Sequence, residues 1–126
     1  LMSWPSQVSP ERVVDQPAIN ADLVPTIAQI TGYDQSLVGR TIDGQNILPL
    51  LLRDTTYHRD IYWYFSQRDE FAYRSGNWKI IGDELYNLSN DMSEANNLAP
   101  KYPEKYRELK SEYDSIYNNM TPYQSK

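Results

Sequence analysis

Few side chains in this sequence of 126 residues could do chemistry by themselves. The chain contains no cysteine, which excludes thiolate nucleophiles, thiolate metal sites and disulfides within it. His58 is the only histidine. Because a metal site needs several converging ligands, and we expect neither a carboxylate partner nor a second ligand beside this imidazole, its type and context favour a position on the surface or at the rim of a cleft.

An aromatic residue and two cations lie close together later in the chain. Arg74, Trp78 and Lys79 flank the turn sequence Ser-Gly-Asn. Guanidinium and ammonium groups can pair with an anion. The competing interpretation places Trp78 in the core and both cations in solvent, which is the commoner fate of such residues.

Charge and hydropathy argue against two classes of partner. The 17 acidic and 12 basic residues give a net charge of −5, and no run of Lys or Arg could follow a phosphate backbone, so we expect no nucleic acid partner. No apolar stretch approaches the roughly 20 residues of a membrane span, so we expect no membrane partner. The length fits one ordinary domain with a modest core.

The elements that must position these residues fall into two unlike halves. In the first, residues 1–4 are expected to form a short apolar strand, followed by a Pro-containing connector. Asp22 is expected to cap a helix that ends at Gly32. The apolar stripe of this helix consists of Leu23, Ile27 and Ile30. Residues 47–52 form a continuous apolar segment that must be covered by something.

The second half contains short aromatic and β-branched runs separated by turn residues, which predicts an antiparallel meander. The four expected strands are residues 61–65, 70–74, 78–81 and 84–88. A long amphipathic helix is expected from Pro103. Its apolar stripe consists of Tyr106, Leu109, Tyr113, Ile116, Tyr117 and Met120. We therefore predict an α+β fold in which this helix packs on one face of a small four-stranded sheet.

The stretch ELYNLSNDMSEANNLA, residues 84–99, connects the last strand to that helix. Asn90 and Asp91 are expected to turn the chain through hydrogen bonds from side chain to backbone. Glu94 and Asn97 are expected to satisfy free backbone groups in the next turn. We interpret the stretch as a structural device, because nothing in it resembles a catalytic constellation.

Four stretches, in order, resemble the C-terminal portion of the sulfatases, in the alkaline phosphatase superfamily. They are DLVPTIAQITG at 22–32, IDGQNILPLLL at 42–52, YRSGNWKII at 73–81 and the stretch at 84–99. The corresponding family motifs are a D-L-x-P-T helix, a D-G-x-S-L-x-P-L-L segment, an R-x-G-x-W-K hairpin and an E-L-Y-D-L-x-x-D-P-x-E-x-x-N-L-A bend. The departures are small: Asn46 replaces Ser, Asn87 replaces Asp and Met92 replaces Pro. The resemblance covers roughly residues 1–120.

This resemblance implies a division of the chain. Residues 1–52 would be the end of the sulfatase N-terminal α/β domain, and residues 53–126 would be the C-terminal subdomain. The family's chemistry, hydrolysis of sulfate esters by a formylglycine beside calcium, would belong to a missing N-terminal catalytic domain. The lookalike SWPSQ at 3–7 has Gln7 where the nucleophile motif C/S-x-P-x-R requires Arg. We therefore expect this chain alone to be inactive and to hold no cofactor, metal or catalytic residue.

The resemblance also implies a parent that acts on a sulfated carbohydrate or an aryl sulfate, with this part forming one wall of the substrate cleft. His58, Arg74, Trp78 and Lys79 are the candidates to line that wall. Family members are commonly periplasmic, secreted or lysosomal, which leaves the compartment undetermined. Without a partner domain the apolar segments of the first half would be exposed, so we expect a homodimer or larger assembly.

Two alternatives stay open. One is a free-standing carbohydrate- or partner-binding module that uses Trp63 and Trp78 as stacking platforms, which requires both rings on a flat, exposed face and not beneath the C-terminal helix. The other is the corresponding part of a phosphonate or phosphate monoester hydrolase, which shares the superfamily scaffold.

Overall fold

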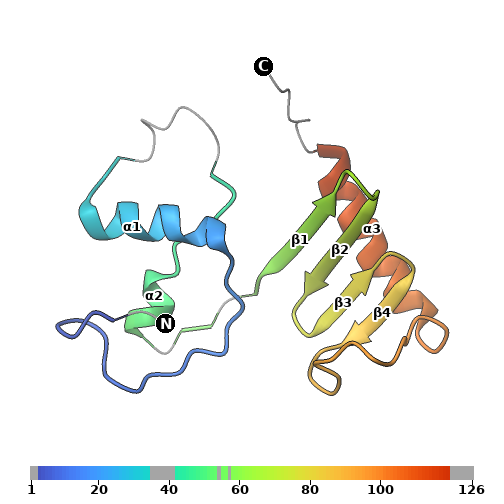
Figure 1. The fold of residues 1–126 in the computed structure, drawn as a ribbon, viewed down its shortest axis with the longest axis horizontal. Helices are drawn as coiled ribbons and strands as arrows, with labels where there is room; N and C mark the ends of the chain where they lie inside the picture. Colours follow the sequence, from blue (N-terminus) through green and yellow to red (C-terminus); the bar gives the residue numbers. More distant parts are fainter. Residues whose placement is uncertain (1–2, 35–41, 54, 57, 120–126) are drawn as a thin grey trace. The chain divides into compact units, whose positions relative to one another are not determined.

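The structure is a computed structural model that describes residues 3–34, 42–53, 55–56 and 58–119. The chain forms two compact units, Leu1–Tyr57 and His58–Lys126. The elements, drawn in Figure 1, are η1 (Asn20–Asp22), α1 (Leu23–Thr31), α2 (Leu48–Leu52), β1 (Asp60–Phe65), β2 (Glu70–Ser75), β3 (Trp78–Ile81), β4 (Glu84–Asn87) and α3 (Pro103–Asn119). This is the predicted α+β architecture. Within the described ranges, no helix has the length and apolar character needed to cross a membrane.

The predicted first helix is confirmed as α1. It ends at Gly32, whose φ of 70° lies in the left-handed region that glycine tolerates best. The expected cap is wrong, because the Asp22 side chain makes no capping bond to the helix. Its carboxylate is fully buried and accepts the backbone N–H of Ile19 at 2.8 Å and that of Gln45 at 2.9 Å.

Two of the quoted motifs hold each other in the first unit. Besides the bond from Asp22 to the Gln45 amide, the Thr26 hydroxyl accepts the backbone N–H of Ile47 at 3.0 Å and donates to the Asp22 carbonyl at 2.6 Å. Gly44 passes so near that a Cβ there would lie 1.9 Å from the Ala21 carbonyl oxygen. We call this arrangement the 22/26 clamp; it joins α1 to the segment that leads into α2.

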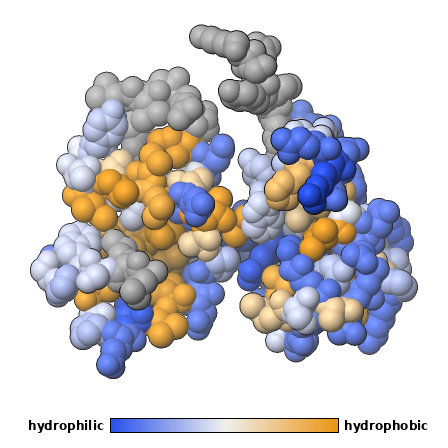
Figure 2. Space-filling model, in the orientation of Figure 1, coloured by the Kyte–Doolittle hydropathy of each residue, from blue (hydrophilic) through white to orange (hydrophobic). Residues whose placement is uncertain are grey.

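The apolar stripe of α1 is exposed, and the opposite side of the helix is buried. Leu23 and Ile27 are each 55% exposed, whereas Thr26 and Ala28 are buried. Figure 2 shows hydrophobic side chains gathered on the first unit, while the second unit presents a mostly hydrophilic surface. In α2, the residue that is fully buried is Leu50. The described residues of this chain cover the apolar segment only in part, and the expectation that something else covers the rest stays a prediction.

The expected strand at 1–4 is not seen in its described part. Residues 1 and 2 lie outside the described residues. Ser3 and Trp4 are not in a strand, and the Trp4 carbonyl accepts the N–H groups of Gln7 and Val8 in a turn.

The second unit is the predicted meander with the predicted helix. Its strands pair antiparallel in the order β1-β2-β3-β4, and α3 lies across one face of the sheet (Figure 1). The core consists of Tyr73, Ile80, Leu85, Leu109 and Tyr113. Tyr117 departs from the expected stripe because it is 41% exposed and stacks on Tyr113, and Met120 lies outside the described residues.

The bend after β4 is built as expected at two of its four residues, Asp91 and Asn97. Asn90 differs from the expectation, because its backbone N–H, and not its side chain, makes the turn bond, which it donates to the Asn87 carbonyl at 3.1 Å. The Asp91 carboxylate accepts the Asn96 backbone N–H at 2.8 Å, and this bond is the first cause of its lowered pKa. The Asn97 side chain accepts two backbone N–H groups. Glu94 also differs, since its carboxylate binds the side chain of Lys79 on the sheet.

Candidate functional site

The strand register separates the candidate residues onto two faces of the sheet. Arg74 and Lys79 are directly opposed on β2 and β3, next to residues that point into the core under α3. Because neighbouring residues of a strand alternate, both side chains lie on the face opposite α3. Trp63 of β1 shares that face, with its ring centroid 5.7 Å from the Lys79 ammonium. We call this set, Trp63, Arg74 and Lys79, the cationic face.

Lys79 already has a carboxylate partner. Its Nζ lies 2.6 Å from an oxygen of Glu94, and the two side chains are 19% and 28% exposed. Glu94 has a φ of 56°, a left-handed conformation that costs a non-glycine residue about 1 kcal/mol. The ion pair helps to offset that cost, so Lys79 holds the bend after β4, and its charge is largely neutralised.

Arg74 is better placed to meet an anion. Its Nε donates to the Gly76 carbonyl at 2.9 Å, which fixes the guanidinium over the β2–β3 turn. A guanidinium has five N–H donors, so this bond leaves most of them for a further acceptor. A held guanidinium suits bidentate contact with a tetrahedral oxyanion or a carboxylate.

His58 lies beside a carboxylate, which the sequence analysis did not expect. Its Nε2 is 3.0 Å from Asp60 Oδ1 and 3.2 Å from the Ser75 hydroxyl. This Ser, His and Asp set is not a nucleophile relay, because both contacts use the same ring nitrogen, whereas a relay needs one partner on each. Asp60 follows His58 by two residues, and that spacing places both side chains on one side of an extended chain.

Trp78 lies on the α3 face of the sheet, apart from the cationic face. It packs against the core, and its ring centroid is 5.7 Å from that of Tyr102. The structure therefore brings Arg74 and Lys79 together and separates Trp78 from them. Since Trp63 and Trp78 lie on opposite faces, the flat, two-tryptophan platform of the binding-module alternative is absent. In the part of the chain that the structure describes, no three His, Asp or Glu residues converge to hold a metal ion.

Comparisons with known proteins point to one family, although no family model matches the chain. Steryl-sulfatase of Mus musculus is 39% identical over 67 residues, which is 51% of this chain and 10% of that protein. Arylsulfatase K of Danio rerio is 25% identical over 129 aligned residues, covering 89% of this chain and 23% of that protein. Human arylsulfatase H is 41% identical over 51 residues, or 40% of this chain and 9% of that protein.

The fold gives the same answer. A solved sulfatase structure, from work on the metabolism of multiple glycosaminoglycans by Bacteroides thetaiotaomicron, superposes with a TM-score of 0.70 and 26% sequence identity. The superposition covers 92% of this chain and 28% of that one, so the chain spans less than a third of its matched relatives. Sequence and fold both support the predicted resemblance to the C-terminal portion of the sulfatases.

Proposed function

We propose that this chain is the C-terminal part of a sulfuric ester hydrolase, in which it completes the fold and forms one wall of the substrate cleft. The observation that supports this best is that one sulfatase structure covers 92% of the chain, including both compact units. The proposed substrate is a sulfated carbohydrate or an aryl sulfate. The formylglycine nucleophile and its calcium ion are proposed to come from another part of the protein, since SWPSQ lacks the arginine of the nucleophile motif.

Among the four candidates for the cleft wall, Arg74 fits the role best. Its guanidinium is positioned by one backbone bond and keeps donors for a sulfate group. His58 is exposed two residues before β1, and its imidazole can contribute a second hydrogen-bonding group. In this proposal Lys79 and Trp78 do not contact the substrate. Lys79 holds the bend after β4 through Glu94, and Trp78 supports the sheet from the α3 face.

The first test measures sulfate release from 4-nitrophenyl sulfate in the presence of calcium. The chain alone is expected to release nothing above the buffer rate, because it supplies no complete nucleophile motif. The product of the same gene, extended by its upstream coding sequence, is expected to be active. Turnover by the chain alone that survives repurification would contradict the proposal, and so would an inactive extended protein.

In that extended protein, Arg74→Ala is expected to lower kcat/KM by about 10- to 100-fold, the worth of a hydrogen bond to a charged group. Arg68→Ala is the matched control, because that side chain is 76% exposed in the β1–β2 turn. Equal losses in the two variants would remove Arg74 from the cleft wall. Running both with 4-nitrophenyl phosphate and a phenylphosphonate ester tests the other ester classes; a preference for either would favour the phosphate or phosphonate hydrolase.

We also propose that the isolated chain self-associates through α1. Leu23, Val24 and Ile27 are each more than half exposed, and contiguous apolar surface of this kind is rare on monomers. Light scattering coupled to size exclusion is expected to give a dimer or larger at micromolar concentration. The double variant Leu23→Lys, Ile27→Lys should be monomeric, whereas Val13→Lys, at a separate exposed valine, should not change the mass. A monomeric parent chain would contradict this proposal.

A further inference from the structure

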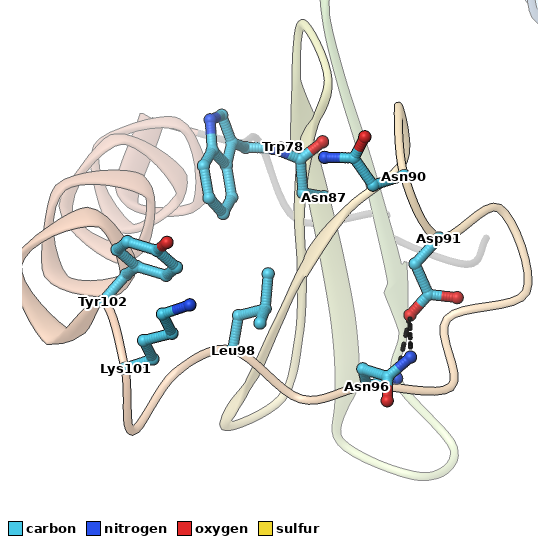
Figure 3. Close-up of a pocket in the computed structure, with 8 residues that line it drawn as sticks. All are labelled: Trp78, Asn87, Asn90, Asp91, Asn96, Leu98, Lys101 and Tyr102. Atoms are coloured by element: carbon cyan, nitrogen blue, oxygen red, sulfur yellow. Dashed lines mark hydrogen bonds between the residues drawn. The ribbon is translucent and has the colours of Figure 1, made fainter.

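An open hollow of about 360 Å³ lies on the second unit where β3 begins and β4 ends. Figure 3 shows Trp78 and Tyr102 on one side of it and Asn90, Asp91 and Asn96 on the other. Its volume is at the small end of the roughly 300–1,000 Å³ of ligand sites, so it admits a single ring and not an extended chain. The cationic face lies on the other side of the sheet, which separates this hollow from the proposed cleft wall.

The aromatic side of the hollow forms a corner. The rings of Trp78 and Tyr102 meet at 70° with their centroids 5.7 Å apart. Lys101 completes this side, with its ammonium 5.3 Å from the Tyr102 ring centroid. An edge-to-face pair of this kind presents apolar ring surface, and a cation resting on one ring adds a positive charge beside it.

The opposite side of the hollow offers amide groups. Asn87 uses its oxygen to accept the Ser89 backbone N–H at 3.1 Å, which leaves its Nδ2 as a donor. Asn90 adds a second amide beside it (Figure 3). The Asp91 carboxylate is held by the backbone and side chain of Asn96, and it lies at the end of the hollow away from Lys101.

We propose that this hollow is a subsite for one pyranose ring that carries an anionic substituent. The C–H face of the ring packs into the Trp78–Tyr102 corner, and its hydroxyls bind the amides of Asn87 and Asn90. The anionic substituent lies next to Lys101, since the opposite end carries the negative charge of Asp91. A nucleotide fits the charge less well, because its phosphates need several cations, and among the described residues that line the hollow Lys101 is the cation.

The full chain, labelled with ¹⁵N, provides a direct test through the indole N–H resonance of Trp78. N-acetylglucosamine 6-sulfate is expected to shift this resonance saturably, with a Kd between about 0.1 and 10 mM for a ligand of this size. Unmodified N-acetylglucosamine should bind at least about fivefold more weakly, because it lacks the charge that pairs with Lys101. Sodium sulfate alone should give no saturable shift. The indole resonances of Trp4 and Trp63, which are not among the residues that line the hollow, should not move.

Two exposed variants test the contacts without removing core residues. Lys101→Ala should reduce the affinity for the sulfated sugar to that for the neutral sugar, and Tyr102→Ala should weaken both by about threefold or more. Lys105→Ala and Tyr117→Ala are the controls; Tyr117 and Tyr102 are both 41% exposed, and Tyr117 does not line the hollow.

Three results would overturn the proposal. One is the absence of a saturable shift at about 50 mM sulfated sugar, well above the expected Kd. Another is equal binding of the sulfated sugar and either the neutral sugar or sulfate alone. The third is an equal loss of affinity in the control variants.

Discussion

Replacing Leu109 by alanine should remove a large part of the stability of the second unit. Leu109 is fully buried among Tyr73, Ile80 and Leu85. The change deletes three carbon atoms at about 0.8 kcal/mol each, and the cavity that remains raises the expected loss to about 3 kcal/mol. A unit of roughly 60 residues is stable by only about 3–9 kcal/mol, so the variant loses a third or more of that reserve. Leu109→Asp, which also buries a charge, should lose more.

Urea unfolding of the full chain, followed by far-UV circular dichroism and by tryptophan fluorescence, measures this loss. Trp63 and Trp78 both lie in the second unit and report on it directly. Glu108→Ala is the control at the neighbouring position: its carboxylate accepts a bond from Lys105 at the surface, which is worth at most about 0.5 kcal/mol. A change below about 1 kcal/mol for Leu109→Ala, or equal changes in both variants, would refute the packing of α3 on the sheet.

Three further predictions concern other contacts. Gly44→Ala should destabilise the first unit by several kcal/mol, because the added Cβ would meet the Ala21 carbonyl oxygen. Gly32→Ala, where the added Cβ has open space at a φ of 70°, should cost about 1 kcal/mol. Hydrogen exchange of the α1 amides compares the two variants, and equal protection would contradict the close approach at Gly44. Tyr73→Phe should cost about 1 kcal/mol by losing the bond to Glu112. Burial and the nearby charges of Asp60 and Glu112 raise the pKa of Tyr73. The stabilisation that the protonated Tyr73 gives to the fold is therefore complete below pH about 10 and is lost as the pH rises toward the raised pKa. If the free energy of unfolding, measured with urea, falls with alkaline pH in Tyr73→Phe as much as in the parent, this prediction is wrong. A double-mutant cycle on Lys79→Met and Glu94→Gln should give a coupling of about 1 kcal/mol, against a value near zero for the exposed pair Arg107 and Glu104, and the reverse order would show that the Lys79 pair is not structural.

The meander could be predicted from sequence because its signals are local. Turn residues separate four β-rich runs, and each observed strand begins and ends within one residue of its predicted bounds. The helix from Pro103 followed from a regular apolar spacing, which fixes the face that packs on the sheet. Asp91 and Asn97 were predictable for the same reason, since their partners lie within a few residues or on the adjoining strand.

The contacts that sequence reasoning missed depend mainly on distant partners. The Asp22 carboxylate does not cap the helix and instead accepts the backbone N–H of Gln45, 23 positions away, which no local sequence pattern predicts. Glu94 likewise found Lys79, 15 positions earlier, once the register had placed β3 beside the bend. Which residues share a face of the sheet also depends on the strand register. Trp78 and Lys79 are adjacent in sequence, yet they point to opposite sides of the sheet. The pairing of His58 with Asp60 could have been predicted from the sequence, because the two residues are only two positions apart.

The hydrogen bonds of the 22/26 clamp determine which of its positions tolerate substitution. Gln45 and Ile47 enter it through backbone N–H groups, so almost any residue except proline can stand at either position. The carboxylate of Asp22, the hydroxyl of Thr26 and the missing side chain of Gly44 have no such freedom. Saturation mutagenesis of positions 22, 26, 44, 45 and 47 should therefore show three intolerant sites, Asp22, Thr26 and Gly44, and two permissive ones. Sequence similarity in these two motifs therefore reports a shared backbone arrangement, which a protein can keep whether or not it retains catalytic activity.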